Sequence, residues 1–384
     1  MRRKNSLCFL LSVTTVLVLA CAEKPAIKPH HATGSTPPLR KEFRQALSVG
    51  VLLPLSGRYR IPAESVLHGL ECAAGIFKPC RTEQTIRLVI RDTGEGNPEA
   101  TSRALEELAL EGVHGAIVLP VDGELEALAE PVKRLNLPTV LLTPRTDAAS
   151  WLGGGLFRNF LTIPDQVRTI VDYACQGKKD FAILFPQTPV GTEFEKEFSQ
   201  KVEACGGRVT ARQSYEAETV DFTEALRGLK LNRSKFDLNA ALGFEALFIP
   251  DTYRKTLLAC EAMKFLGMQG VLLMGGAGWD HPSLAEDTSG LLEGAIFADG
   301  FFPRSDNKVT RDFTDRFEAA FSFSPTLIEA YAYDALRLQT LGSPLTGLKD
   351  FDGATGPISF EKDGEGRRKL FLLTVDRNEI RQIP

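Results

Sequence analysis

Several points in the chain where an apolar run ends bear side chains that could hold a small molecule. Arg145 could offer a planar fork of N–H donors to a carboxylate or a phosphate. Hydroxyls, carboxylates and flat aromatic faces occur at comparable places, and the candidate binding residues are Ser56, Tyr59, Asp122, Thr143, Arg145, Thr146, Asp251, Tyr253 and Trp279. Because ligand pockets combine apolar walls with a few directed polar groups, this set predicts the capture of a small molecule.

Three of these candidates also have a purely structural interpretation. Arg145 could pair with Asp122 or Asp147, so that its charge is neutralised within the protein. Trp279 could pack inside its domain at the entry to a helix, and Tyr253 could be a rim residue. The sequence leaves both interpretations open for each of the three.

No group of residues has the spacing of a catalytic or metal site. The sequence lacks a Gly-x-Ser-x-Gly elbow, a phosphate-binding GxxxxGK[ST] loop, an HExxH motif and a Gly-x-Gly-x-x-Gly run after a predicted strand. No Cys-x-x-Cys pair or cysteine–histidine cluster has zinc-ligand spacing. The histidines show no carboxylate partner at a recognisable spacing, and they are His30, His31, His68, His114 and His281. The sequence therefore predicts a binding protein without catalytic activity, metal or cofactor.

The first twenty residues have the features of a secretory signal peptide. A basic start, residues 2–4, precedes a largely apolar run at 9–20, which is shorter than the roughly 20 residues of a membrane-spanning helix. Val18 to Cys21 resembles the lipobox of bacterial lipoproteins, which implies a lipid on Cys21. Ala22 stands where an aspartate would resemble an inner-membrane retention signal, so we expect a periplasmic protein anchored to the outer membrane. Residues 21–46 lack hydrophobic periodicity and predict a flexible tether.

Length, charge and cysteine use limit the remaining possibilities. About 340 residues follow the tether, more than one compact core normally holds, so two domains are expected. The net charge of −4, with basic and acidic residues interspersed, provides no basic face for nucleic acid. Export to an oxidising compartment allows Cys72 to pair with Cys80 and Cys175 with Cys205, whereas Cys260 lies in an apolar helical stretch and predicts a buried thiol.

From residue 47 onward, short apolar runs alternate with amphipathic stretches, which is typical of parallel sheets covered on both faces. The pattern first predicts strands at 47–54, 86–91, 115–119 and 139–142 and helices at 63–77, 98–110 and 123–135. It then predicts strands at 180–185, 209–214, 246–249, 271–274 and 295–299 and helices at 166–176, 192–205, 222–229 and 253–266. Helices at 309–321 and 325–341 precede a closing hairpin of 358–360 and 369–375. Because ligands bind beyond the carboxyl ends of parallel strands, the loops after these strands should form the site.

The run from Val49 to Gly57 resembles the first strand and turn of the leucine/isoleucine/valine-binding proteins, a type I periplasmic binding family. The resemblance extends to further short motifs, which are Gly69, Asp92-Thr93, Gly191, Gly294-Ala295, 329–335 and 353–360. It implies an α/β fold of two Rossmann-like lobes with parallel sheets, joined by three crossovers near 160, 294 and 353. Lobe 1 would comprise 47–160 plus 295–352, and lobe 2 would comprise 161–294 plus 353–384.

The sequence departs from this family at positions of its amino-acid site. Pro120 to Gly123 replaces a serine-rich loop, and Val190 replaces an aromatic residue. Ala277 stands where the family places the acid that holds the ligand's ammonium group. The segment 143–147 occupies the place that serves the ligand's carboxylate. Because an uncompensated ammonium in a closed cleft is costly, the departures disfavour a free α-amino acid.

Two functions follow from these resemblances. The family implies a lipid-anchored solute-binding protein that holds an amino-acid-like molecule, a peptide or a carboxylate between two lobes and serves an ABC permease. The stretch Gly278 to Asp280, together with the predicted anchor, is also similar to penicillin-binding-protein activators, which are outer-membrane lipoproteins of the same fold. That similarity implies contact with a penicillin-binding protein in peptidoglycan synthesis.

Overall fold

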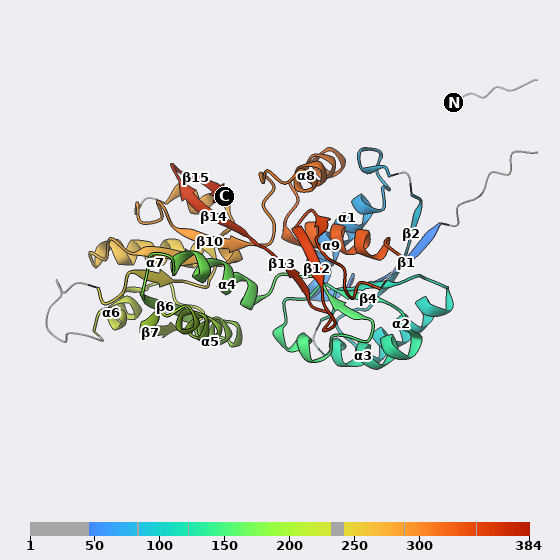
Figure 1. Cartoon of the computed structure of the whole chain (residues 1–384), viewed down its shortest axis with the longest axis horizontal. Coiled ribbons are helices and arrows are strands. Elements are labelled where there is room, and N and C mark those ends of the chain that lie inside the picture. The colour runs from blue at the N-terminus through green and yellow to red at the C-terminus, as the bar shows by residue number, and fades with distance from the viewer. Residues whose placement is uncertain (1–45, 83, 122, 232–241, 288, 343) are drawn as a thin grey trace, which may run out of the picture. The chain divides into compact units, whose positions relative to one another are not determined.

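The computed structural model describes residues 46–82, 84–121, 123–231, 242–287, 289–342 and 344–384 (Figure 1). The predicted signal peptide, Cys21, the tether up to residue 45 and the candidate Asp122 lie outside these residues, as does the side chain of Thr146. None of the helices in the described ranges has both the length and the apolar character needed to cross a membrane.

The first sheet contains parallel strands in the order β2-β1-β3-β4-β5. They are β1 (Leu47–Leu53), β2 (Ile86–Asp92), β3 (Ala116–Val118), β4 (Thr139–Leu141) and β5 (Leu156–Arg158). The helices between them are α1 (Arg60–Ala73), α2 (Pro98–Leu110) and α3 (Glu124–Leu135). The sequence pattern does not predict β5, because its Leu-Phe-Arg sequence lacks the β-branched residues that mark the equally short β3 and β4.

Both faces of this sheet are buried, which explains why β1 is apolar along its whole length. Val51 of β1 packs in one core cluster with Leu70 of α1, whereas its neighbour Leu52 packs in another with Leu108 of α2. α2 begins where the sequence predicts, because the side chain of Asn97 accepts hydrogen bonds from two backbone N–H groups of the first turn.

The second sheet has the order β15-β14-β10-β9-β8-β6-β7. Its strands are β6 (Asp180–Pro186), β7 (Arg208–Tyr215), β8 (Ala246–Phe248), β9 (Leu272–Gly275), β10 (Ile296–Asp299), β14 (Phe371–Asp376) and β15 (Glu379–Gln382). β6 to β10 run parallel, and β14 and β15 complete the edge in antiparallel fashion. The helices are α4 (Ile163–Ala174), α5 (Pro189–Ala204), α6 (Thr223–Leu231) and α7 (Tyr253–Phe265). Two parallel-stranded α/β lobes are thus present, as predicted.

The closing segment differs from the predicted hairpin of 358–360 and 369–375. β12 (Gly356–Phe360) pairs antiparallel with β11 (Phe351–Gly353) and β13 (Gly366–Arg368), and these form a separate small sheet. The next strand, β14, pairs instead with β10 and β15. The prediction is wrong because β13 has the sequence Gly-Arg-Arg, which shows no apolar strand pattern.

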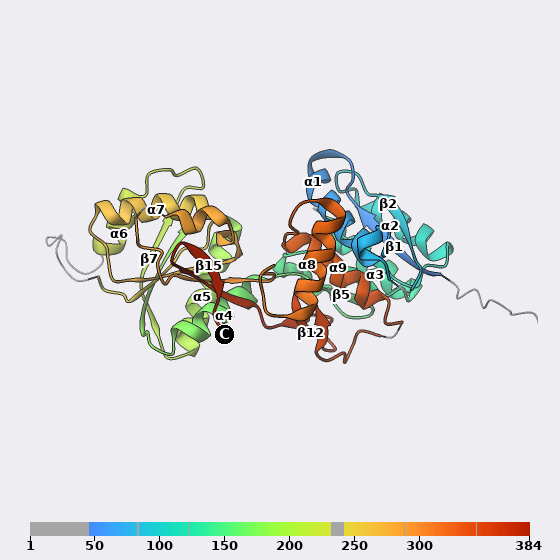
Figure 2. The same cartoon turned by 90° about the horizontal axis from the view of Figure 1, so that it is seen from above.

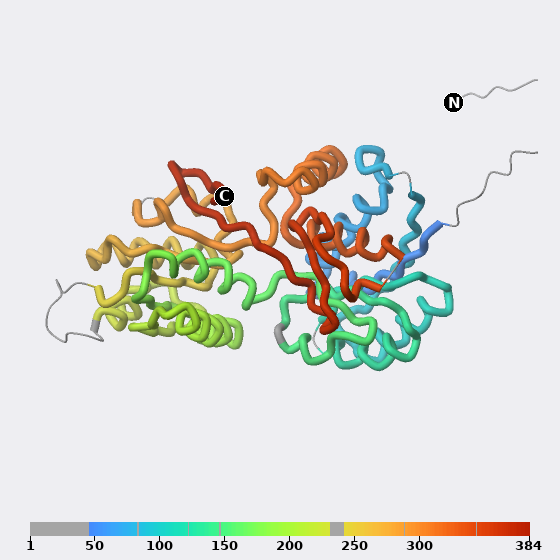
Figure 3. Tube along the Cα trace, in the orientation of Figure 1, coloured from blue at the N-terminus to red at the C-terminus, as the bar shows by residue number. Residues whose placement is uncertain are grey.

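The chain passes between the two large sheets three times within the described residues (Figure 2 and Figure 3). It leaves the first sheet after β5 and returns after β10, since the next helices, α8 (Lys308–Phe321) and α9 (Leu327–Gln339), pack on α1. Phe360 of β12 contacts Phe157 of β5, so the last crossing follows β13. The crossovers expected near 294 and 353 therefore fall later, because β10 belongs to the second sheet and the 351–368 segment packs with the first.

Two disulfides among the described residues link the ends of helices to nearby segments. Cys72 in α1 is bonded to Cys80, and Cys175, just after α4, is bonded to Cys205, just after α5. Both pairings are those that the sequence suggests. Cys260 in α7 is a buried free thiol, and burial raises its pKa.

Candidate ligand-binding site

Asp92 ties together the loops after β1 and β2. Its carboxylate accepts hydrogen bonds from the backbone N–H groups of Leu55 (2.9 Å) and Gly94 (2.8 Å) and from the hydroxyl of Ser56. Burial acts to raise the pKa of Asp92, but these hydrogen bonds together outweigh it and hold the pKa below its usual value. The candidate Ser56 is exposed, and its hydroxyl is engaged by Asp92 at the neighbouring loop.

The candidate Tyr59 lies half-buried at the start of α1, with the guanidinium of Arg58 4.7 Å from the centre of its ring.

The loop after β3 is held by Glu124, the first residue of α3. Glu124 is fully buried, and its carboxylate accepts hydrogen bonds from the backbone N–H of Val121 (2.8 Å) and from the hydroxyl of Thr101. Burial raises the pKa of Glu124, although these hydrogen bonds oppose the shift.

The loop after β4 contains Thr143, Arg145 and Thr146. Thr143 is buried, and its hydroxyl accepts a hydrogen bond from the backbone N–H of Arg145 (3.3 Å). The guanidinium of Arg145 forms an ion pair with Asp147, with Nε 3.0 Å from Oδ1, and this contact lowers the pKa of Asp147. The structure thus shows the internal pairing of Arg145 that the sequence leaves open. The side chain of Arg145 is still 35% exposed.

Arg158, the last residue of β5, supports this loop from the interior. Its side chain is only 4% exposed and forms an ion pair with Glu365, with Nε 2.9 Å from Oε1. The same guanidinium donates to the backbone carbonyl of Arg145. Because both charges and the carbonyl are satisfied together, the pair fixes the path of the loop.

The second sheet has a pocket of about 430 Å³ at the carboxyl ends of β6, β8 and β9. Its walls are mostly apolar or small, and they include Val190 and Ala277, two positions at which the sequence departs from its family. The other lining residues are Gln166, Pro186, Thr188, Phe194, Ala217, Pro250, Asp251, Thr252, Gly276 and Gly278. Of these, only Asp251 is among the candidates from the sequence.

Gln166 of α4 connects to the loop after β9. Its Oε1 accepts a hydrogen bond from the backbone N–H of Ala277 (2.9 Å), and its Nε2 donates to the carbonyl of Thr162 (3.3 Å). A Cβ atom at Gly276 would lie 2.6 Å from the same Oε1, so any other residue there would displace the end of the Gln166 side chain. Gln166 and Ala277 are 111 positions apart, and no local sequence pattern could have paired them.

Asp251, which follows β8, is held in place on both sides. It accepts hydrogen bonds from the hydroxyl of Tyr215 and from the backbone N–H of Thr252, both at 2.6 Å. Burial and then this carboxylate raise the pKa of Tyr215. Tyr253, in contrast, stacks on His281 with ring centres 3.8 Å apart and does not line the pocket. This placement fits a rim residue.

Trp279 faces the interior of the second lobe. Its side chain is fully buried, and its Nε1 donates to the backbone carbonyl of Ile249 (3.0 Å). The ring lies so close to Gly275 that a Cβ atom there would be 2.1 Å from Cδ2. Trp279 therefore presents no face to a ligand, which corrects its place among the binding candidates and agrees with the packed interpretation.

A buried polar cluster lies where β13 leads toward β14. The guanidinium of Arg368 donates to Oδ1 of Asn159 and lies 4.3 Å above the ring of Tyr331. Asn159 in turn donates to the carbonyl of Tyr331 (3.1 Å), so the segment after β5 is joined to α9. Burial raises the pKa of Tyr331.

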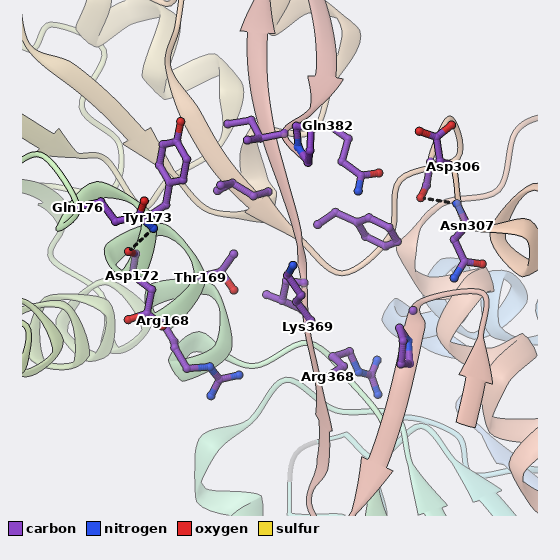
Figure 4. A pocket seen from close by; sticks show the side chains of 18 residues that line it. Arg168, Thr169, Asp172, Tyr173, Gln176, Asp306, Asn307, Arg368, Lys369 and Gln382 are labelled. Carbon is purple, nitrogen blue, oxygen red and sulfur yellow. Dashed lines mark hydrogen bonds between the residues drawn. The ribbon is translucent and has the colours of Figure 1, made fainter. Parts of the chain in front are cut away.

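A pocket of about 620 Å³ lies beside this cluster, since Arg368 also lines it. Figure 4 draws the side chains of its lining. Arg168 and Asp172 of α4 lie on one side of it, and Lys369 and Asp306 also line it. No candidate residue from the sequence is part of its lining.

The described residues form no group of three or more histidine, cysteine, aspartate or glutamate side chains that could hold a metal ion. What the loops offer is hydrogen-bonding groups, apolar walls and fixed charges. Such an arrangement is suited to reversible, noncovalent binding.

Comparisons with known proteins agree with this geometry. A family model described as periplasmic binding protein matches residues 46–379. No curated protein sequence matches the chain. Among solved structures, one from Rhodospirillum rubrum, described as a branched-chain amino acid ABC transporter, has a TM-score of 0.76 at 17% identity and covers 88% of this chain and 100% of its own.

Two further similar structures hold ligands. A solute-binding protein from R. palustris in complex with 4-hydroxybenzoate has a TM-score of 0.64 at 20% identity, covering 88% of this chain and 96% of its own. A branched-chain amino acid substrate-binding protein from Streptococcus pneumoniae in complex with isoleucine has a TM-score of 0.61 at 16% identity, covering 88% and 98%. At these identities the structures establish a shared fold.

Proposed function

Because the chain belongs to the periplasmic binding protein family, and within it to the leucine-binding type I group, we propose that it captures a small ligand at the carboxyl ends of its two parallel sheets. The pocket on the second sheet is the observation that supports this most directly, since its walls combine apolar surface with the ordered polar groups of Gln166 and Asp251. Its lining contains no nucleophile paired with a base, so we propose binding without catalysis.

The ligand we propose is an amino-acid-like molecule, a short peptide or a carboxylate. For the ligand carboxylate we propose Arg145 in the loop after β4, because its guanidinium is 35% exposed and would exchange part of its pairing with Asp147 for the ligand. 4-Hydroxybenzoate and isoleucine, the ligands of two similar structures, both contain a carboxylate. Ala277 argues against the ordinary mode of binding a free α-amino acid, because it offers no charge to an ammonium group.

The family is extracytoplasmic, and we further propose that this protein is a periplasmic lipoprotein anchored through Cys21, with the outer membrane favoured, and that it passes its ligand to an ABC permease. Labelled palmitate should enter the mature protein, and a Cys21→Ala variant should lose the label. Retention of the label by that variant would show that the anchor lies elsewhere.

The test of the binding function is a thermal melting screen over amino acids, short peptides, carboxylates and muropeptides. A ligand that binds only the native state stabilises it by RT ln(1 + [L]/Kd), so a true ligand raises the melting temperature in a concentration-dependent way. A correctly folded sample that responds to no compound would contradict the proposal.

That negative result would favour the second function, contact with a penicillin-binding protein as an outer-membrane lipoprotein. The replacement of the expected acid by Ala277 supports this alternative, because a protein that contacts a synthase needs no ammonium site. Capture of a purified penicillin-binding protein, in the absence of any small ligand, would then be the direct measurement.

A further inference from the structure

Two carboxylates meet at the carboxyl ends of β9 and β10. These strands are parallel neighbours, with Met274 opposite Ile296. Asp299 is the last residue of β10, and Asp280 follows β9 after a single short turn. Both line a pocket of about 960 Å³, which shares only Ala277 with the pocket of about 430 Å³ on the second sheet. Because β9 and β10 are neighbours in the second sheet, that sheet alone brings the two carboxylates together.

Neither carboxylate has a hydrogen-bonded cation among the described residues. The side chain of Asp299 is buried, with the residue only 3% exposed, and its Oδ1 accepts hydrogen bonds from the backbone N–H groups of Gly300 and Phe301 (3.2 Å for the latter). No described residue donates to its Oδ2 or to the carboxylate of Asp280. These oxygens therefore remain available to an occupant of the pocket.

Arg304 is the nearest positive charge, but it is engaged elsewhere. Its guanidinium donates to the carbonyl of Ile380 (3.0 Å) and lies over the ring of Phe302, 5.4 Å from its centre. The rest of the pocket lining adds three carboxylates, from Asp315, Glu318 and Glu379, and one guanidinium, from Arg311. The lining thus has an excess of negative charge.

Each carboxylate shows the effect of this environment. Burial and then the charge of Asp280 raise the pKa of Asp299 well above its usual value. Asp280 keeps contact with solvent, yet the protein atoms around it raise its pKa to about 6, against the opposing influence of Arg304. The two groups therefore disfavour each other's ionised form, and a positively charged partner would relieve the repulsion.

We propose that Asp280 and Asp299 form a subsite for a primary ammonium group of the ligand. The inference rests on the proposed function and narrows the ligand class to molecules that bear a protonated amine. An ammonium group has three N–H donors, which suits the open carboxylate oxygens, and the rings of Phe301 and Phe302 in the same lining suit the attached carbon chain. A divalent ion fits less well, since Ca²⁺ takes six to eight oxygen ligands and two carboxylates supply too few.

The experiment measures the melting temperature of the full chain against butylammonium chloride at constant ionic strength, with 1-butanol as the uncharged counterpart and CaCl₂ as the metal alone. Butylammonium should stabilise the protein, whereas 1-butanol and Ca²⁺ should not. The apparent Kd for butylammonium should rise about tenfold or more in Asp280→Asn and in Asp299→Asn, because each change removes a charge-assisted hydrogen bond. Asp352→Asn changes an exposed carboxylate outside this lining; it is the matched control and should bind as the unaltered chain does.

Equal butylammonium affinity in the unaltered chain and in Asp280→Asn would overturn the proposal, as would stabilisation by Ca²⁺ that Asp280→Asn abolishes. Since Asp280 is solvent-exposed, this variant provides a test even where Asp299→Asn fails to fold. Stabilisation by carboxylates but by no compound that bears an amine, short peptides included, would refute the ammonium subsite and leave the binding function intact. A chain that responds to no small molecule at all would refute both.

Discussion

The carboxyl ends of the two parallel sheets differ in how their polar groups are satisfied. On the first sheet Asp92, Glu124 and Arg145 are each bonded to atoms of their own or a neighbouring loop. On the second sheet the loops after β9 and β10 combine small residues with two carboxylates, Asp280 and Asp299, that have no hydrogen-bonded cation among the described residues. Loops whose polar groups are hydrogen-bonded within the protein keep their shape without a ligand. Loops with unbalanced negative charge gain the most electrostatic free energy when a positively charged ligand binds. We infer that ligand discrimination resides mainly at the second sheet.

The largest expected effect comes from disrupting the order of the first-sheet loops. Arg158→Ala should lower the free energy of unfolding by about 3–5 kcal/mol, because it leaves the carboxylate of Glu365 without its partner in a buried ion pair. It also removes the donor to the carbonyl of Arg145. Urea denaturation with an unchanged m-value would measure the loss.

The matched control is Arg60→Ala, which removes an exposed ion pair with Glu64 one helical turn away. This change should cost about 0.5 kcal/mol or less. Similar losses in the two variants would mean that the Arg158 pair is not a specific support, and the contrast between the two sheets would lose its structural basis.

The sequence predicts elements well where the signal is local. Asn97 and Pro98 mark the start of α2, and the apolar runs of β1 and β2 mark two strands that pair in the structure. It fails where partners are distant. β14 pairs with β10 rather than with the segment before it.

The same limit applies to the site. Tryptophan in a loop after a strand is compatible with a ligand-facing ring or a packed one, and only the position of the Ile249 carbonyl decides for Trp279. Gln166 lies inside a predicted helix with nothing to mark it, although it anchors the loop of Ala277. The closeness of Asp280 and Asp299 depends on β9 and β10 being neighbours, which no spacing in the sequence reveals.

The second prediction tests whether the first sheet contributes to affinity at all. If Arg145 contacts a ligand carboxylate, Arg145→Ala should weaken binding by about 1.5–3 kcal/mol, the range for a charge-assisted hydrogen bond. Stability without ligand should change little, because the ion pair with Asp147 is partly exposed. Titration calorimetry with a ligand from the melting screen measures the affinity.

Arg145→Lys should recover only part of the loss, because lysine lacks the planar fork. A lower melting temperature of Arg145→Ala without ligand, together with unchanged affinity, would assign Arg145 a structural role only. The loop after β4 would then hold the site in shape without touching the ligand.

The smallest expected effect concerns the charge repulsion between Asp280 and Asp299 at the second sheet. The pKa of Asp280 is raised to about 6 from 3.8 because the surrounding protein atoms partly desolvate its carboxylate, so the folded chain holds this proton more tightly than the unfolded chain does. The stability that this proton contributes is complete below about pH 4 and is lost as the pH rises through about 6. The charged groups that act on it are Asp299, whose ionised form repels that of Asp280, and Arg304, whose positive charge opposes the shift.

Asp280→Asn removes the ionisation and should therefore stabilise the ligand-free protein at pH 8, by about 1 kcal/mol once solvent screening of this exposed side chain is allowed for. The advantage over the unaltered chain should shrink as the pH falls through 6 and vanish near pH 4, because both chains are then uncharged at this position. Urea denaturation at a series of pH values measures it, with Asp315→Asn as the exposed control that should show no such dependence. A stability gain that persists unchanged at pH 4 would point to better packing by asparagine instead of relieved repulsion, and the two sheet ends would then differ in shape but not in charge balance.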